Sequence, residues 1–147
     1  MHWYQPLDQR ILEWRHWRRS LPTDLAPCLL EIQNWWRTSP WRKVSQLSDD
    51  ISQWPTPWTL FDNMSYCDGK RALGMFYTMC LIPQLRALKP EIWIMYTAQG
   101  ERAVIAVLDQ GKYVLNFASD KIVNIQNLGD EFQQVLKYYP EDFKTLE

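Results

Sequence analysis

The sequence has 147 residues, of which 46% are hydrophobic and 22% charged, and its formal net charge is −1. This length suits one domain and excludes a second full one, and the composition excludes a disordered or fibrous chain. The small net charge excludes a strong overall attraction to nucleic acid or anionic lipid.

Charge and tryptophan are unevenly distributed along the chain. The first 45 residues carry seven Lys or Arg against four Asp or Glu, whereas the next 25 carry four Asp and one Lys. Eight of the nine tryptophans lie at or before Trp58. Because no Gly/Ser/Pro-rich linker separates the halves, we interpret residues 1–60 and 61–147 as two parts of a single domain, 1–147.

Two amphipathic helices are predicted in the tryptophan-rich part, because apolar side chains recur there every three to four residues. The first covers Asp8–Ser20. The second begins after Thr23 or Asp24, either of which could cap it, and Pro40 closes it.

A polar, irregular segment follows, Val44–Trp54, in which Ser48-Asp49-Asp50 could start a short turn. Two prolines then fix the backbone, and one or two helical turns are predicted over Trp58–Asn63. The three aspartates Asp49, Asp50 and Asp62 do not match the spacing of a calcium-binding loop, so we interpret them as helix caps and solvated turns and not as a metal site.

The next helix, Cys67–Ile82, is predicted to be central and buried. Its apolar side chains fall on one face, and Gly74 suggests close packing against another element. Pro83 interrupts the longest nearly uncharged stretch, which is also too short to span a bilayer. The N-terminus lacks the basic and apolar regions of a signal peptide, so we expect a chain that is not secreted by that route.

Residues rich in β-branched and aromatic side chains predict strands over Glu91–Thr97, Arg102–Leu108 and Lys112–Phe117. A further short strand is predicted over Lys121–Ile125 and a closing helix over Gly129–Tyr138. The fold class is therefore α+β, with tryptophan-rich helices, a central helix on a small antiparallel sheet, and a C-terminal helix.

Three stretches resemble the transglutaminase-like cysteine proteins, above all the bacterial transglutaminase-like cysteine peptidases. They are Tyr66–Gly74, Glu101–Val107 and Tyr113–Phe117, which follow the family order of a cysteine at a helix start, a strand with histidine and a strand with aspartate. The resemblance implies a papain-like core. It places Cys67 at the nucleophile position, Arg102 at the histidine position and Asn116 at the aspartate position.

The expected hairpin geometry agrees with the family's placement of these residues, but an arginine cannot perform the chemistry of the histidine. If residues 109–111 form the turn, Asn116 faces Val104 and is diagonal to Arg102, so both share a face. A helix N-terminus at Cys67 favours a reactive thiolate. An arginine stays protonated, however, and cannot act as the general base that a Cys-His pair uses. We interpret Cys67, Arg102 and Asn116 as a degenerate site with no assigned catalytic residue, while Cys67 as nucleophile remains the alternative.

The other cysteines and the histidines add no catalytic group. Cys28 and Cys80 lie on apolar helix faces and are expected in the core. His2 and His16 lie far upstream, on or before the first helix. The cysteines have no metal-ligand spacing and are odd in number, so we expect free thiols, no metal and no cofactor.

The tryptophans suggest a partner surface, because tryptophan and arginine are enriched at interface hot spots. The candidate partner-binding residues are Trp3, Trp14, Trp17, Trp41, Trp54 and Trp58. Trp3, Trp41 and Trp54 are expected to face solvent. The alternative is that the tryptophans fill the core and that the arginines near residue 18 are simply solvated.

A second resemblance concerns the segment from Trp54 to Thr78, which is similar to small proteins of large tailed phages. It implies a protein of the virion or the host cytoplasm whose partners are other virion proteins, with oligomeric assembly possible. Nucleic acid is not expected as a partner, because the total charge is acidic and the sequence has no Gly-rich loop or RNA-binding motif. Two function classes result. One is a non-catalytic binding or assembly protein, a pseudoenzyme; the other is a thiol peptidase or acyltransferase.

Overall fold

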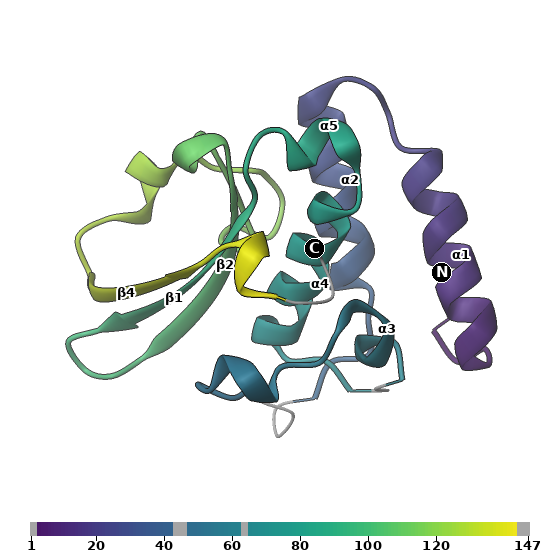
Figure 1. Ribbon diagram of the computed structural model, residues 1–147. Helices are drawn as coiled ribbons and strands as arrows, with labels where there is room; N and C mark the ends of the chain where they lie inside the picture. Colours follow the sequence, from purple (N-terminus) through teal and green to yellow (C-terminus); the bar gives the residue numbers. More distant parts are fainter. Residues whose placement is uncertain (1–2, 43–46, 63–64, 144–147) are drawn as a thin grey trace.

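The computed structural model describes residues 3–42, 47–62 and 65–143. A four-stranded antiparallel sheet forms one layer, α4 covers one face of it, and α2 and then α1 lie farther out on the same side (Figure 1). The helices are α1 Leu7–Arg19, α2 Leu25–Arg37, α3 Pro57–Leu60, α4 Asp68–Cys80 and α5 Pro83–Arg86. The strands are β1 Glu91–Thr97, β2 Arg102–Leu108, β3 Tyr113–Leu115 and β4 Phe132–Tyr138. The predicted α+β class is confirmed.

Helix α4 is the central buried helix that the sequence predicts. Ten of its thirteen residues are buried, and it contacts β2 and β1 on one side and α2 on the other. Gly74 makes the second contact possible, because a Cβ at that position would lie 2.5 Å from ring atoms of Trp36 on α2. A residue with a side chain would therefore push the indole out of place, which is why glycine is needed there.

The tryptophan-rich part contributes mainly core. Trp14 and Trp36 are completely buried, and Trp17 on α1 stacks on Trp35 of α2 with ring centroids 4.3 Å apart. Trp3 and Trp54, expected to face solvent, are only 5% and 8% exposed, so that expectation is wrong. Both rings pack against other aromatic rings. Burying such a large apolar surface lowers the free energy of the folded state, so burial is favoured over exposure to solvent.

The β2–β3 hairpin differs from the predicted register by one residue. Ala106 pairs with Leu115, so Asn116 does not face Val104 through strand pairing. Lys112 has helical backbone angles and extends the turn to four residues, 109–112. A one-residue shift reverses the face of each following side chain. The alternation that predicted a shared face for Asn116 and Arg102 therefore does not hold.

The C-terminal segment is a strand and not the predicted closing helix. Residues Phe132–Tyr138 form β4, which pairs with β1 along its length and makes β1 an interior strand. Leu136 and Tyr138 both pack on the core that α4 shares, a period-2 pattern typical of a strand. The helix was predicted from the spacing of Phe132, Val135 and Leu136, but the unpaired edge of β1 favours strand pairing over local helix propensity.

The predicted strand over Lys121–Ile125 is also wrong as an extended element. Val123 alone forms an isolated bridge, to Val114. A 3-10 helix, η3, begins at Ile125 and ends at Leu128, with Asn124 as its cap. The segment Val44–Trp54 contains η1, Ile51–Gln53, while residues 44–46 lie outside the described part of the chain. Within the described ranges, no helix is long and apolar enough to cross a membrane.

Candidate functional site

A pocket of about 760 Å³ lies where the N-terminus of α4 meets β2 and the end of β3. All three residues that the family resemblance singles out, Cys67, Arg102 and Asn116, line this pocket, which we call the Cys67 pocket. Its remaining described lining residues are Trp41, Asp49, Asp68, Gly69, Tyr96, Gly100, Ala103, Val104 and Phe117. The fold thus brings together residues that lie far apart in the sequence.

Cys67 is the N-cap residue of α4. Its Sγ accepts a hydrogen bond from the backbone N–H of Lys70, with N and S 3.4 Å apart, and its side chain is 9% exposed. The thiol therefore faces the positive end of the helix dipole, an environment that stabilises negative charge. Cys67 resembles a positioned nucleophile in its placement, but placement alone does not provide a proton acceptor.

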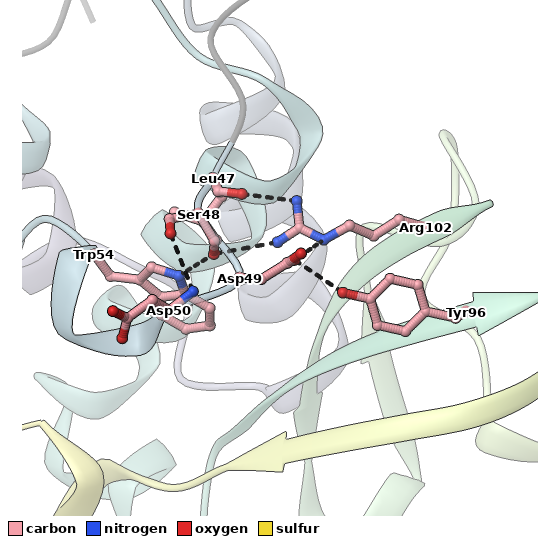
Figure 2. Close-up of polar contacts among 7 residues, drawn as sticks. All are labelled: Leu47, Ser48, Asp49, Asp50, Trp54, Tyr96 and Arg102. Atoms are coloured by element: carbon pink, nitrogen blue, oxygen red, sulfur yellow. Dashed lines mark hydrogen bonds and ion pairs between the residues drawn. The ribbon is translucent and has the colours of Figure 1, made fainter. Parts of the chain in front are cut away.

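Arg102 occupies the wall of the pocket and is held by the segment before η1 (Figure 2). Its Nη1 donates to the carbonyl of Leu47 at 2.8 Å, its Nη2 reaches the carbonyl of Ser48 at 3.4 Å, and its Nε lies 3.3 Å from Asp49 Oδ1. Nη1 and Nη2 thus donate hydrogen bonds, whereas the buried Nε forms an ion pair with Asp49 and has no hydrogen-bond partner among the described residues. Arg102 therefore serves as a fixed clamp for residues 47–49.

Asp49 is shared between Arg102 and Tyr96. The Tyr96 hydroxyl donates to Asp49 Oδ1 at 2.8 Å, so the carboxylate has both a cation and a phenol as neighbours (Figure 2). Desolvation, with the hydrogen bond and charge of Asp49 next, raises the pKa of Tyr96, and Arg102 partly offsets this. Tyr96 consequently stays protonated at neutral pH and does not act there as a proton acceptor.

Asn116 is used as a structural connector. Its backbone has φ of +71°, a left-handed conformation that asparagine tolerates. Its Nδ2 donates to the carbonyls of Asp68 and Val104 at 2.9 and 3.0 Å, and its Oδ1 accepts from Arg37 Nη1 at 3.2 Å. Both ends of the amide are thus occupied, and the left-handed backbone, not strand alternation, directs the side chain to the pocket.

Gln33 is a connector that the sequence analysis missed. It is completely buried on α2, and its Oε1 accepts from the backbone N–H of Asn116 at 2.7 Å. Its Nε2 donates to the carbonyls of Ala118 and Lys121 at 3.0 and 3.3 Å. The signal in the sequence was a glutamine on an apolar helix face, because such a side chain needs partners once it is buried.

No histidine is among the described residues that line the Cys67 pocket. His16 is an exposed residue of α1, the helix that lies on the far side of α4 from the sheet (Figure 1), and His2 lies outside the described residues. The other two thiols have raised pKa values. Burial raises the pKa of Cys80 to about 12 and, with a smaller contribution from Glu31, raises that of Cys28. Both are buried free thiols, as expected for core residues.

Two of the six candidate partner-binding tryptophans are exposed. Trp41 is 52% exposed and lines the Cys67 pocket, whereas Trp58 is 45% exposed and lies near α1 and α5. Trp17 is partly buried against Trp35, and the other three are core residues. The pocket is therefore bordered by one exposed tryptophan, which is the arrangement of an aromatic anchor beside a cavity.

No family model matches the sequence, and no curated protein sequence matches it. Among solved structures, the chain is similar to LapG of Legionella pneumophila, with a TM-score of 0.65 and 13% identity over 88% of this chain and 75% of that one. Calcium-bound LapG gives 0.64 and 12% over the same shares, and EGTA-treated LapG gives 0.65 and 13% over 88% and 73%. At such identities the likeness concerns the fold alone. The fold is transglutaminase-like, in agreement with the resemblance in the sequence.

Proposed function

We propose that this chain is a non-catalytic binding protein that uses a transglutaminase-like scaffold to hold a protein partner. The observation that carries the proposal is the state of Arg102, whose guanidinium is bonded to residues 47–49 at the place where the family resemblance expects a histidine. A guanidinium that is always protonated cannot take the proton of Cys67 or return it to a leaving group.

Asn116 supports the same conclusion. In a cysteine-histidine site a carboxylate or amide orients the imidazole, and Cys-His-Asn sites function in other folds. Here the Asn116 amide already bonds two backbone carbonyls and Arg37, so it holds the N-terminus of α4 to β2. The residues of a triad layout are thus used to fix the shape of the pocket.

We propose Trp41 as the anchor of the partner surface. It is the exposed tryptophan at the Cys67 pocket, and planar aromatic anchors next to a cavity contribute most of the binding energy at many interfaces. The proposed setting is a tailed-phage particle or the host cytoplasm, where other virion proteins are the partners. The support for this setting is the sequence resemblance of the segment 54–78 alone.

Replacing Trp41 with alanine should release the partner while the domain stays folded. We expect a loss of about 2 kcal/mol or more in binding free energy, because an exposed anchor contributes to the complex and not to the core. The test uses the wild-type chain, Trp41→Ala and Tyr4→Ala as baits in lysate from the native source, with the captured proteins quantified by mass spectrometry. Tyr4 is the matched control, since it is an 82% exposed aromatic residue that does not line the pocket.

The expected result is a protein kept by the wild type and Tyr4→Ala and lost by Trp41→Ala at unchanged melting temperature. Equal capture by all three baits would reject Trp41 as the anchor. Capture of a partner that is not a virion protein would reject the phage setting and leave the binding role standing.

The alternative is a thiol peptidase or acyltransferase with Cys67 as nucleophile. One observation favours it, namely that the Cys67 Sγ lies at a helix N-terminus on the edge of a pocket. This function requires a general base other than histidine, because no histidine is among the described residues that line the pocket, and it predicts an activity that disappears in Cys67→Ala.

A further inference from the structure

A second and larger hollow, of about 930 Å³, lies between α1, the loop after it, α3 and the α5 region. We call it the α1–α5 groove. Its floor is apolar and includes Ile11, Leu21, Leu25, Trp58, Leu85 and Leu88. Pockets of this size with a mainly apolar lining and a few polar groups are the usual form of small-molecule sites.

The charged groups of the groove all have the same sign. Arg15, Arg18 and Arg19 come from one wall, α1, and none of the described lining residues is acidic. Arg18 lies over the ring of Trp14, with its Cζ 4.3 Å from the ring centroid, and its buried Nε has no hydrogen-bond partner among the described residues. The groove therefore combines an apolar floor with a cationic wall that lacks a carboxylate.

The electrostatic state of Arg18 agrees with this geometry. Its pKa is lowered, first because burial removes water from the guanidinium and then because Arg15 and Arg19 repel the added charge. An anion placed among the three guanidinium groups would relieve this repulsion and could accept paired hydrogen bonds from an arginine.

We propose that the α1–α5 groove binds a small anionic amphiphile, a molecule with an apolar body and one carboxylate or phosphate head group. The body would replace water on the leucine and isoleucine floor, and the head group would lie against Arg15 and Arg18. A flat bilayer or a nucleic-acid duplex fits less well, because the floor is concave and a broad surface would not reach it. The groove uses no residue of the Cys67 pocket, so this site is independent of the proposed function.

The test is calorimetric titration of the full chain with three probes of equal chain length, each below its micelle concentration. Dodecanoate and dodecyl phosphate carry the proposed head groups, and dodecyltrimethylammonium carries the opposite charge. We expect one of the anions to bind at one site per chain, at least tenfold more tightly than the cation. Equal affinity for the cation, or no binding of either anion, would overturn the proposal.

Three variants locate the site. The double change Arg15→Gln/Arg18→Gln should weaken anion binding about tenfold or more. Leu21→Trp should also weaken anion binding, because the larger side chain would fill part of the groove. Arg42→Gln is the control, because Arg42 is exposed and does not line the groove. Melting curves confirm that each variant is folded. An equal loss in Arg42→Gln would show non-specific charge binding, and an acidic peptide that binds where both amphiphiles fail would show a protein-docking groove instead.

Discussion

Replacing Thr78 with valine should destabilise the fold by about 2–6 kcal/mol, because one buried hydroxyl serves two tryptophans. Thr78 Oγ1 accepts from the indole N–H of Trp14 at 3.1 Å and of Trp36 at 2.9 Å, and it donates to the carbonyl of Gly74 at 2.7 Å. Valine has the same shape but no acceptor. Each buried indole N–H left without a partner costs about 1–3 kcal/mol.

The loss would be large relative to the whole stability of a domain, which is typically about 5–15 kcal/mol. Thr38 supplies the matched control, since its hydroxyl also accepts from an indole, that of Trp3 at 3.0 Å, but the threonine is exposed. Thr38→Val should cost less than about 1 kcal/mol, because water can replace the lost acceptor. Urea unfolding of both variants measures the difference, and equal midpoints would contradict the hydroxyl's role between α1, α2 and α4.

Replacing Trp54 with alanine should cost about 3–5 kcal/mol, the usual range for a buried tryptophan. Trp54 is 8% exposed, its ring packs against Tyr138 and Phe143, and its indole N–H donates to the carbonyl of Ser48. The same carbonyl accepts from Arg102 (Figure 2). The change therefore removes core contacts and also one support of the segment that holds Arg102.

Trp41→Ala is the comparison for this variant. Because Trp41 is 52% exposed, its replacement should lower the free energy of unfolding by no more than about 1 kcal/mol. Denaturant unfolding of the two variants side by side checks the contrast. Similar losses in the free energy of unfolding for both variants would contradict the assignment of Trp54 to the core and of Trp41 to an exposed binding surface.

Local sequence signals were sufficient where one signal dominated. The strands 91–97 and 102–108 agree with the structure at both ends, because β-branched runs bounded by turn residues leave little ambiguity. Helix α4 and the close approach at Gly74 were also predictable, since a glycine inside an apolar helix face often marks tight packing against a neighbouring element.

Long-range partners decided the remaining elements. Residues 132–138 form a strand because they pair with an otherwise unpaired edge of β1, and their local sequence does not indicate that this edge is unpaired. The one-residue register difference comes from Lys112 joining the turn, a local backbone choice with effects along the whole hairpin. Trp3 and Trp54 are buried by rings from distant segments, such as Phe61 and Phe143, so their local sequence does not predict their burial.

The sequence predicted which residues lie together at the site, but it did not predict the hydrogen bonds and ion pairs that they make. Family order grouped Cys67, Arg102 and Asn116, and the fold brings them to one pocket. The contacts of Arg102 with Leu47 and Asp49, and those of Asn116 with Asp68 and Arg37, depend on segments distant in sequence. These contacts, and not the residue identities alone, are the basis of the proposal that the site is structural and not catalytic.

Binding without catalysis is tested by mass spectrometry of a native-source proteome incubated with the wild-type chain or with Cys67→Ala. The method counts new chain N-termini, which report peptide cleavage, and newly acylated amines, which report acyl transfer. We expect both chains to give the same products, because Arg102 cannot accept the Cys67 proton. Products that form with the wild type and are absent with Cys67→Ala would contradict it and establish a cysteine enzyme.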